Sequence, residues 1–100
     1  MNYQPELDEQ LDENIKREVT VLVEHGIETI ESCESGEGHP YPYPMIRFHG
    51  GRSEGLKALA IALQNGFNVR GLHREWLVID GEVTGPWWEM TFYPHQGQVK

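Results

Sequence analysis

The sequence predicts an α+β fold, a two-layer sandwich in which an antiparallel four-stranded sheet carries two helices on one face. Three observations predict it. Two segments repeat apolar residues at helical spacing, four have strand-like composition, and turns separate them in the order helix, strand, strand, helix, strand, strand. The 100 residues have the size of a single domain. We expect residues 1–5 and 95–100 to be frayed ends.

The first helix is predicted by apolar residues at spacings of four, four, four and three. These residues are Leu7, Leu11, Ile15, Val19 and Leu22. Pro5 suits the first helical turn, and Gly26 is expected to end the helix in a left-handed cap. The β-branched residues at 19–21 weakly favour a strand, but the helical spacing continues through them and favours the helix.

The next segment predicts two strands joined by a long loop. Residues 27–31 and 45–49 have strand composition, and residues 32–39 have loop composition. Prolines alternate with tyrosines at 40–44, which predicts an extended stretch that is not a central strand because proline lacks a backbone donor. Gly50 and Gly51 then turn the chain.

The second helix is predicted to begin at a Ser53 cap and to end at Gly66. Its expected buried face has the spacing i, i+3, i+4 and i+7. That face consists of Leu56, Leu59, Ala60 and Leu63.

Two further strands follow, at 67–80 and 87–93, with a turn bracketed by Asp80-Gly81 and Gly85-Pro86. Alternation in the last strand directs Trp88, Met90 and Phe92 to one face and Trp87, Glu89, Thr91 and Tyr93 to the other. Trp87 and Trp88 therefore cannot share a face. Either one of them forms an exposed aromatic surface, or its ring lies under a helix end or loop.

Composition excludes several classes of protein. Ten aromatic residues and 38% hydrophobic residues are not typical of a disordered chain. No apolar stretch is long enough to span a membrane, the N-terminus is polar rather than signal-like, and the single Cys33 allows no internal disulfide. We therefore expect a cytoplasmic protein without a membrane partner.

Charge is concentrated in the first part of the chain. Residues 1–38 hold eleven acidic and two basic residues, whereas the whole chain has a net charge of −8. An acidic surface repels phosphate backbones, so nucleic acid is not an expected partner. The acids either solvate a helix face or present a surface to the basic groove of another protein.

The first candidate ligand-binding segment is the loop at 32–39. Its candidate residues are Ser32, Cys33, Glu34, Gly36, Gly38 and His39. Catalysis by Cys33 with His39 or His49 as base is disfavoured because nearby acids raise a thiol pKa. Zinc binding by Cys33, His39 and one of His25, His49 or a carboxylate lacks the standard ligand spacing. The remaining interpretation is a structural loop with Cys33 as a small buried residue. We therefore expect no catalytic residue, metal or cofactor.

The second candidate is the glycine-rich turn at 48–56, which leads into a predicted helix. Its backbone donors, with Arg47, His49 and Arg52, are suited to binding an anion. The Walker ending and the dinucleotide fingerprint are absent. The alternative is an ordinary strand-to-helix turn. In a hairpin, this turn and the 32–39 loop lie at opposite ends of the strand pair, which argues against one combined site.

Residues 26–39 and 44–50, with the helix start at 54–59 and the strand at 85–89, resemble a family of small uncharacterised proteins from bacteria and their phages. The resemblance covers residues 19–93 and brings no activity with it. A fainter resemblance, carried by Ser32-Cys33 and Gly36, is to the tRNA-modifying wybutosine methyltransferases. Glu34 interrupts that motif, and this chain is far shorter.

Together these features predict a small cytoplasmic ligand- or protein-binding module, whose partner is an unidentified small ligand or host protein. Two alternatives stay open. One is an enzyme or metal protein that uses the 32–39 loop, and the other is an acidic interaction protein that blocks a basic host target. A homodimer is also compatible with an exposed tryptophan or an open sheet face.

Overall fold

The computed structural model describes residues 15–33, 35 and 43–94. Within them the order of elements is α2 (Lys16–Glu24), β1 (Thr29–Cys33), β2 (Met45–Phe48), α3 (Arg52–Gln64), β3 (Val69–Ile79) and β4 (Glu82–Phe92). The α+β fold with a four-stranded antiparallel sheet is confirmed. The predicted first strand, 27–31, lies two residues before the observed β1. The predicted third strand, 67–80, begins two residues before the observed β3.

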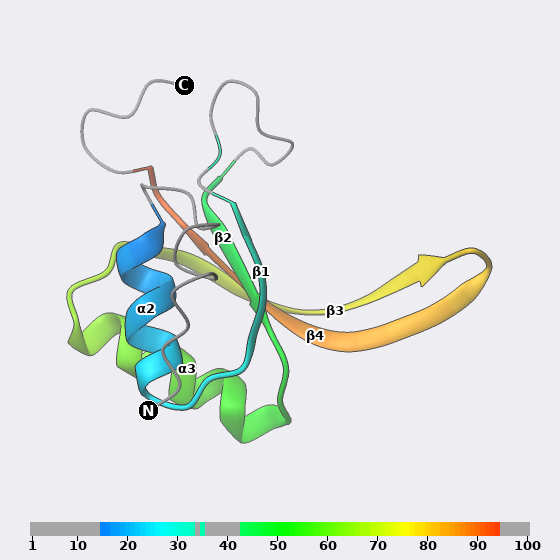
Figure 1. Cartoon of the computed structure of the whole chain (residues 1–100), viewed down its shortest axis with the longest axis horizontal. Coiled ribbons are helices and arrows are strands. Elements are labelled where there is room, and N and C mark those ends of the chain that lie inside the picture. The colour runs from blue at the N-terminus through cyan, green and yellow to red at the C-terminus, as the bar shows by residue number, and fades with distance from the viewer. Residues whose placement is uncertain (1–14, 34, 36–42, 95–100) are drawn as a thin grey trace.

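The sheet has the strand order β1-β2-β4-β3, and every neighbouring pair is antiparallel. Both helices lie on the same side of it, and the β3–β4 hairpin extends well beyond the other elements (Figure 1). The helices and the inner sheet face enclose one apolar core. Its buried members include Val19 and Leu22 from α2, Phe48 from β2, and Met90 and Phe92 from β4.

Glycine ends both helices as predicted, because the chain needs a left-handed residue there. Gly26 has φ +87° and Gly66 has φ +75°. The helical interpretation of residues 19–22 is confirmed, and Ile15, Val19 and Leu22 are buried. The predicted apolar positions 7 and 11 lie outside the described residues.

The predicted Ser53 cap is wrong. Helix α3 begins at Arg52, and its cap position is Gly51, two residues before Ser53, with no side-chain cap hydrogen bond. The Gly51 carbonyl instead accepts hydrogen bonds from the backbone N–H of Glu54 and from the Trp88 indole N–H at 2.9 Å. The start of α3 is therefore tied to β4 rather than capped by its own serine.

The predicted buried face of α3 is wrong at Leu56, Ala60 and Leu63, whereas Leu59 packs against the core as expected. Leu56 and Leu63 are 54% and 58% exposed, whereas the buried residues are Gly55, Ala58, Ile61 and Ala62. The reason is the size of the facing side chain. A Cβ at Gly55 would lie within 2.6 Å of three Trp88 ring atoms, so only the face with small residues lets the helix approach the sheet this closely.

The predicted turn before the last strand is shorter than expected. The chain turns at Asp80-Gly81 alone, and β4 already begins at Glu82. Gly85-Pro86 lies within β4, where the register between β3 and β4 shifts and Gly85 has φ +109°. A proline, which lacks a backbone N–H, is tolerated there because β2 pairs with β4 only at residues 88–91. Beyond Trp88, no described strand accepts a hydrogen bond from this edge of β4.

The predicted alternation in β4 is confirmed. Met90 and Phe92 are buried in the core and Trp88 packs against it, so Trp87 points to the other face. Neither tryptophan forms the expected exposed aromatic surface, because both are half-buried. The exposed tryptophan is Trp76 on β3, with 58% of its surface accessible.

Candidate functional site

The sheet face opposite the helices carries a row of ionisable side chains across all four strands. Strand pairing places Glu31 of β1 beside Arg47 of β2, Arg47 beside Glu89 of β4, and Glu89 beside His73 of β3. We call these four residues the polar row. Directly paired residues on one sheet face have Cβ atoms about 5 Å apart, so all four side chains are neighbours.

Arg47 lies near the centre of this face and joins two carboxylates. Its Nη1 donates to Glu31 Oε1 at 2.9 Å, and its Nη2 lies 3.8 Å from Glu75 Oε2. The Arg47 side chain is only 13% exposed, which strengthens both interactions relative to surface ion pairs. The guanidinium of β2 therefore links the side chains of Glu31 on β1 and Glu75 on β3.

Glu89 and Glu75 form a carboxyl pair next to Arg47. They lie on adjacent strands two residues out of direct register, and their side chains share a hydrogen bond. Burial, this hydrogen bond and the negative charges of Glu75 and Glu31 raise the pKa of Glu89 to about 7, against the opposing effect of Arg47. The carboxyl pair therefore holds a proton at a higher pH than an ordinary glutamate does.

Two aromatic rings border the carboxyl pair. Trp87 pairs directly with Glu75, and its ring lies 5.9 Å from the His49 ring at a tilt of 40°. The Trp87 Nε1 atom is buried without a hydrogen-bond partner in the part of the chain that the structure describes. The site thus combines carboxyl groups that exchange a proton near neutral pH with an aromatic wall on one side.

The 32–39 loop contributes little that can be described. Ser32 pairs with Ile46 and Cys33 pairs with Met45, so alternation directs these two side chains to opposite faces. Cys33 is 5% exposed, and its Sγ accepts a hydrogen bond from the Ser35 N–H at 3.5 Å. The other predicted residues of this segment, Glu34, Gly36, Gly38 and His39, lie outside the described residues.

The structure places the residues of the predicted anion site at the glycine-rich turn on two sides of the sheet. Arg47 and the start of α3 lie on opposite sides of the sheet, so Arg47 and Arg52 do not converge. The Glu54 side chain lies directly over Gly50, where a Cβ would come within 2.4 Å of it. A carboxylate therefore already stands near the positive end of the helix dipole.

The two predicted segments lie at opposite ends of the β1–β2 pair. Cys33 is opposite Met45 at one end, whereas the His49 N–H donates to the Glu28 carbonyl at the other end, at 2.9 Å. Of the described residues selected from the sequence, Arg47 belongs to the polar row, and Cys33 and His49 lie on the same face two residues along their strands from Glu31 and Arg47. Ser32 lies on the opposite face, and Arg52 lies at the start of α3.

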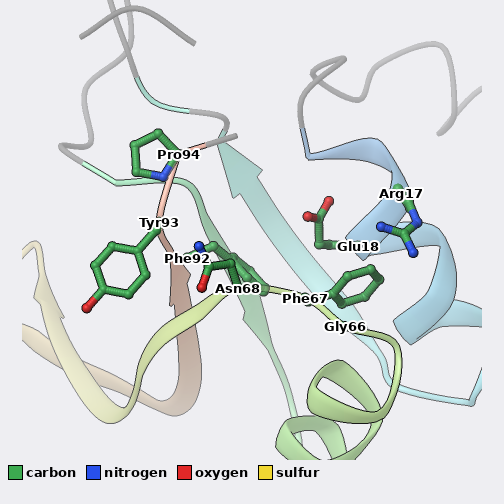
Figure 2. Close-up of a pocket in the computed structure, with 8 residues that line it drawn as sticks. All are labelled: Arg17, Glu18, Gly66, Phe67, Asn68, Phe92, Tyr93 and Pro94. Atoms are coloured by element: carbon green, nitrogen blue, oxygen red, sulfur yellow. The ribbon is translucent and has the colours of Figure 1, made fainter. Parts of the chain in front are cut away.

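A separate pocket of about 200 Å³ lies between the start of α2 and the end of β4. Figure 2 shows Arg17 and Glu18 on one side of it and Asn68, Tyr93 and Pro94 on the other. The Arg17 guanidinium lies 4.8 Å from the centre of the Phe67 ring. None of the described residues that the sequence analysis proposed as ligand-binding residues lines this pocket.

The described residues contain neither a candidate metal-binding cluster nor a helix that could span a membrane. In residues 15–33, 35 and 43–94, no three histidine, cysteine or acidic side chains are arranged to hold a metal ion. None of the described helices has the length and apolar character needed to cross a bilayer.

The sequence did not single out Glu75 and Glu89. Alternation along the last strand placed Glu89 and Trp87 on the face away from the core. This placement was the feature of the sequence that could have indicated a site there. A lone acid on a strand is ordinarily a solvated residue, and only the strand order brings it next to Arg47 and Glu75. No family model matches the chain, and no curated protein or solved structure is significantly similar to it.

Proposed function

We propose that this protein is a ligand-binding module that takes up a group with a single positive charge, an amine or a guanidinium, between Glu89 of the polar row and the neighbouring Glu75. The observation that carries the proposal is the arrangement of charge. Three carboxyl groups, those of Glu31, Glu75 and Glu89, gather around the one guanidinium of Arg47.

The physical argument is a competition between a proton and a cation. Two adjacent carboxylates repel one another, and a proton held by Glu89 relieves that repulsion in the unliganded protein. A cationic group placed between the two carboxyls supplies the same positive charge with more hydrogen-bond donors. Trp87 adds an aromatic surface on which a cation or its carbon chain can pack.

The proposal keeps the expected setting of the protein. The cationic group belongs either to a free small molecule or to a lysine or arginine side chain of a host protein. The expected compartment is the cytoplasm. Nucleic acid stays an unfavourable partner because the net charge of the chain is −8.

The test is a titration of the protein with simple cations. Isothermal titration calorimetry and amide NMR shifts monitor the binding. Propylguanidine and benzylamine represent the free ligand, a short arginine-containing peptide represents the protein source, and benzoate is the anionic control. Binding of a cation should displace the proton of Glu89, so calorimetry near pH 7 should detect proton release that varies with the buffer.

The matched variants are Glu89→Gln, which removes the site, and Glu82→Gln, which removes an exposed carboxylate outside it. We expect the first to lose binding and the second to retain it. If no cation shifts the amide signals of β3 and β4, or if Glu89→Gln binds as tightly as the parent, the proposal is wrong. Preference for the peptide over both small cations would identify a protein as the source.

A further inference from the structure

The outer half of the β3–β4 hairpin is a two-stranded ribbon that neither described helix and no other described strand covers (Figure 1). Strand β2 pairs with β4 only as far as Trp88, so from Trp87 to the turn each strand has the other as its sole partner among the described elements. Figure 1 shows this part of the hairpin extending away from both helices. A two-stranded hairpin alone is marginally stable in water, and such ribbons usually pack against something. We call residues 75–87 the arm.

One face of the arm carries an exposed apolar stripe. Val78 and Val83 are directly paired, and Trp76 lies two residues before Val78 on the same face. Their exposed fractions are 69%, 70% and 58%. Monomeric proteins rarely leave a contiguous patch of this kind on an unprotected strand edge, so the stripe is a candidate contact surface.

The charges around the stripe differ at its two ends. The turn at the tip carries Asp80 and Glu82, whereas Arg74 and Arg52 lie at the base on the same side of the sheet. Glu54 is the acid at the base, and it lies over Gly50. The tip is therefore negative and the base has a net positive charge.

This pattern is self-complementary. The midpoint of the stripe on β3 lies at the backbone of Leu77, with Arg74 three residues towards the base and Asp80 three residues towards the tip. The Leu77 side chain itself points to the other face of the sheet. At about 3.3 Å per residue, both charges lie about 10 Å from Leu77. A two-fold axis near Leu77 would pack two stripes against each other and place Arg74 of one copy opposite Asp80 of the other.

We propose that the arm is a dimerisation surface, and that a second copy of this chain covers the stripe of Trp76, Val78 and Val83 in an antiparallel arrangement. The charge pattern selects a second copy because each end of the arm matches the opposite end of an identical arm. This inference is independent of the cation site, since Glu75 and Glu89 point to the other face of the sheet.

The test is the oligomeric state of the full chain by analytical ultracentrifugation and light scattering. The protein concentration should run from about 5 to about 200 µM, a range wide enough to detect a weak dimer. We expect a monomer–dimer equilibrium within this range. Trp76→Glu should shift it to monomer, and Leu63→Glu should not, although both residues are 58% exposed.

A charge exchange tests the antiparallel arrangement. Arg74→Glu and Asp80→Lys should each weaken the dimer about threefold to tenfold, and the double variant should recover most of the loss. Val83→Lys repeats the test of the stripe if Trp76→Glu alters the circular dichroism of the monomer. The proposal is overturned if the wild type is monomeric throughout, if Leu63→Glu dissociates the dimer equally, or if the double variant fails to recover. A different protein bound to the arm of a monomeric chain would also overturn it.

Discussion

Replacing Gly55 by alanine tests the contact that joins α3 to the sheet. The new Cβ would lie 2.3 Å from Trp88 Cε2 and 2.4 Å from Cζ2, well inside ordinary van der Waals contact. The Trp88 ring cannot retreat easily. Its Nε1–H donates to the Gly51 carbonyl at 2.9 Å, and the Arg74 guanidinium lies 4.7 Å from the ring centre on one face.

Two effects of opposite sign decide the magnitude. Alanine is favoured over glycine inside a helix by about 1 kcal/mol. Overpacking costs about 1–3 kcal/mol, and loss of the Trp88 hydrogen bond costs about 1 kcal/mol more. We therefore expect the free energy of unfolding to fall by about 2 kcal/mol, which corresponds to a midpoint about 10 °C lower.

The measurement is urea unfolding followed by tryptophan fluorescence and circular dichroism. Ala60→Gly is the matched control, because Ala60 is exposed on the same helix and should show the propensity cost alone. The double variant Gly55→Ala with Trp88→Leu should lose less stability than the sum of the two single variants. A Gly55→Ala protein as stable as the wild type would refute the close contact between α3 and Trp88.

Two further predictions concern the candidate site and the loop. The pKa of Glu89 is about 7 in the folded protein, against an ordinary glutamate pKa of 4.5. The folded state therefore binds this proton more tightly than the unfolded state does. The resulting stabilisation is fully present below about pH 4.5 and is lost as the pH rises through 7. After allowance for solvent screening, wild-type protein should lose about 1 kcal/mol relative to Glu89→Gln between pH 5 and 8, measured by urea unfolding; parallel pH profiles would contradict this. Cys33 is 5% exposed, so iodoacetamide should modify it slowly in the native protein and rapidly in urea; equal rates would show that the thiol is accessible.

Local sequence signals predicted most elements and the inner sheet face. Glycine at positions 26 and 66 marked the helix ends, because only a residue without a Cβ readily adopts the left-handed conformation found there. Period-two alternation assigned Met90 and Phe92 to the core, since neighbouring side chains of a strand point to opposite faces. These features depend on residues close together in the chain.

The buried face of α3 could not be predicted from apolar spacing. The helix is apolar on more than one side, so the pattern selected Leu56 and Leu63, and both are exposed. Shape complementarity decided the orientation, because Gly55 is small enough to accommodate the Trp88 ring from a strand 33 residues later in the sequence. Packing of this kind depends on the partner surface and not on the helix alone.

By itself, the sequence determined the α+β class, the order of elements, the helix ends and the single cysteine. Tertiary structure decided that β4 lies between β2 and β3, and this order is what gathers Arg47, Glu75 and Glu89 into one site. The physical reason is range. Backbone conformation and alternation are set by near neighbours, whereas a shared proton or an ion pair needs side chains within a few ångströms, brought there by strand pairing between distant segments.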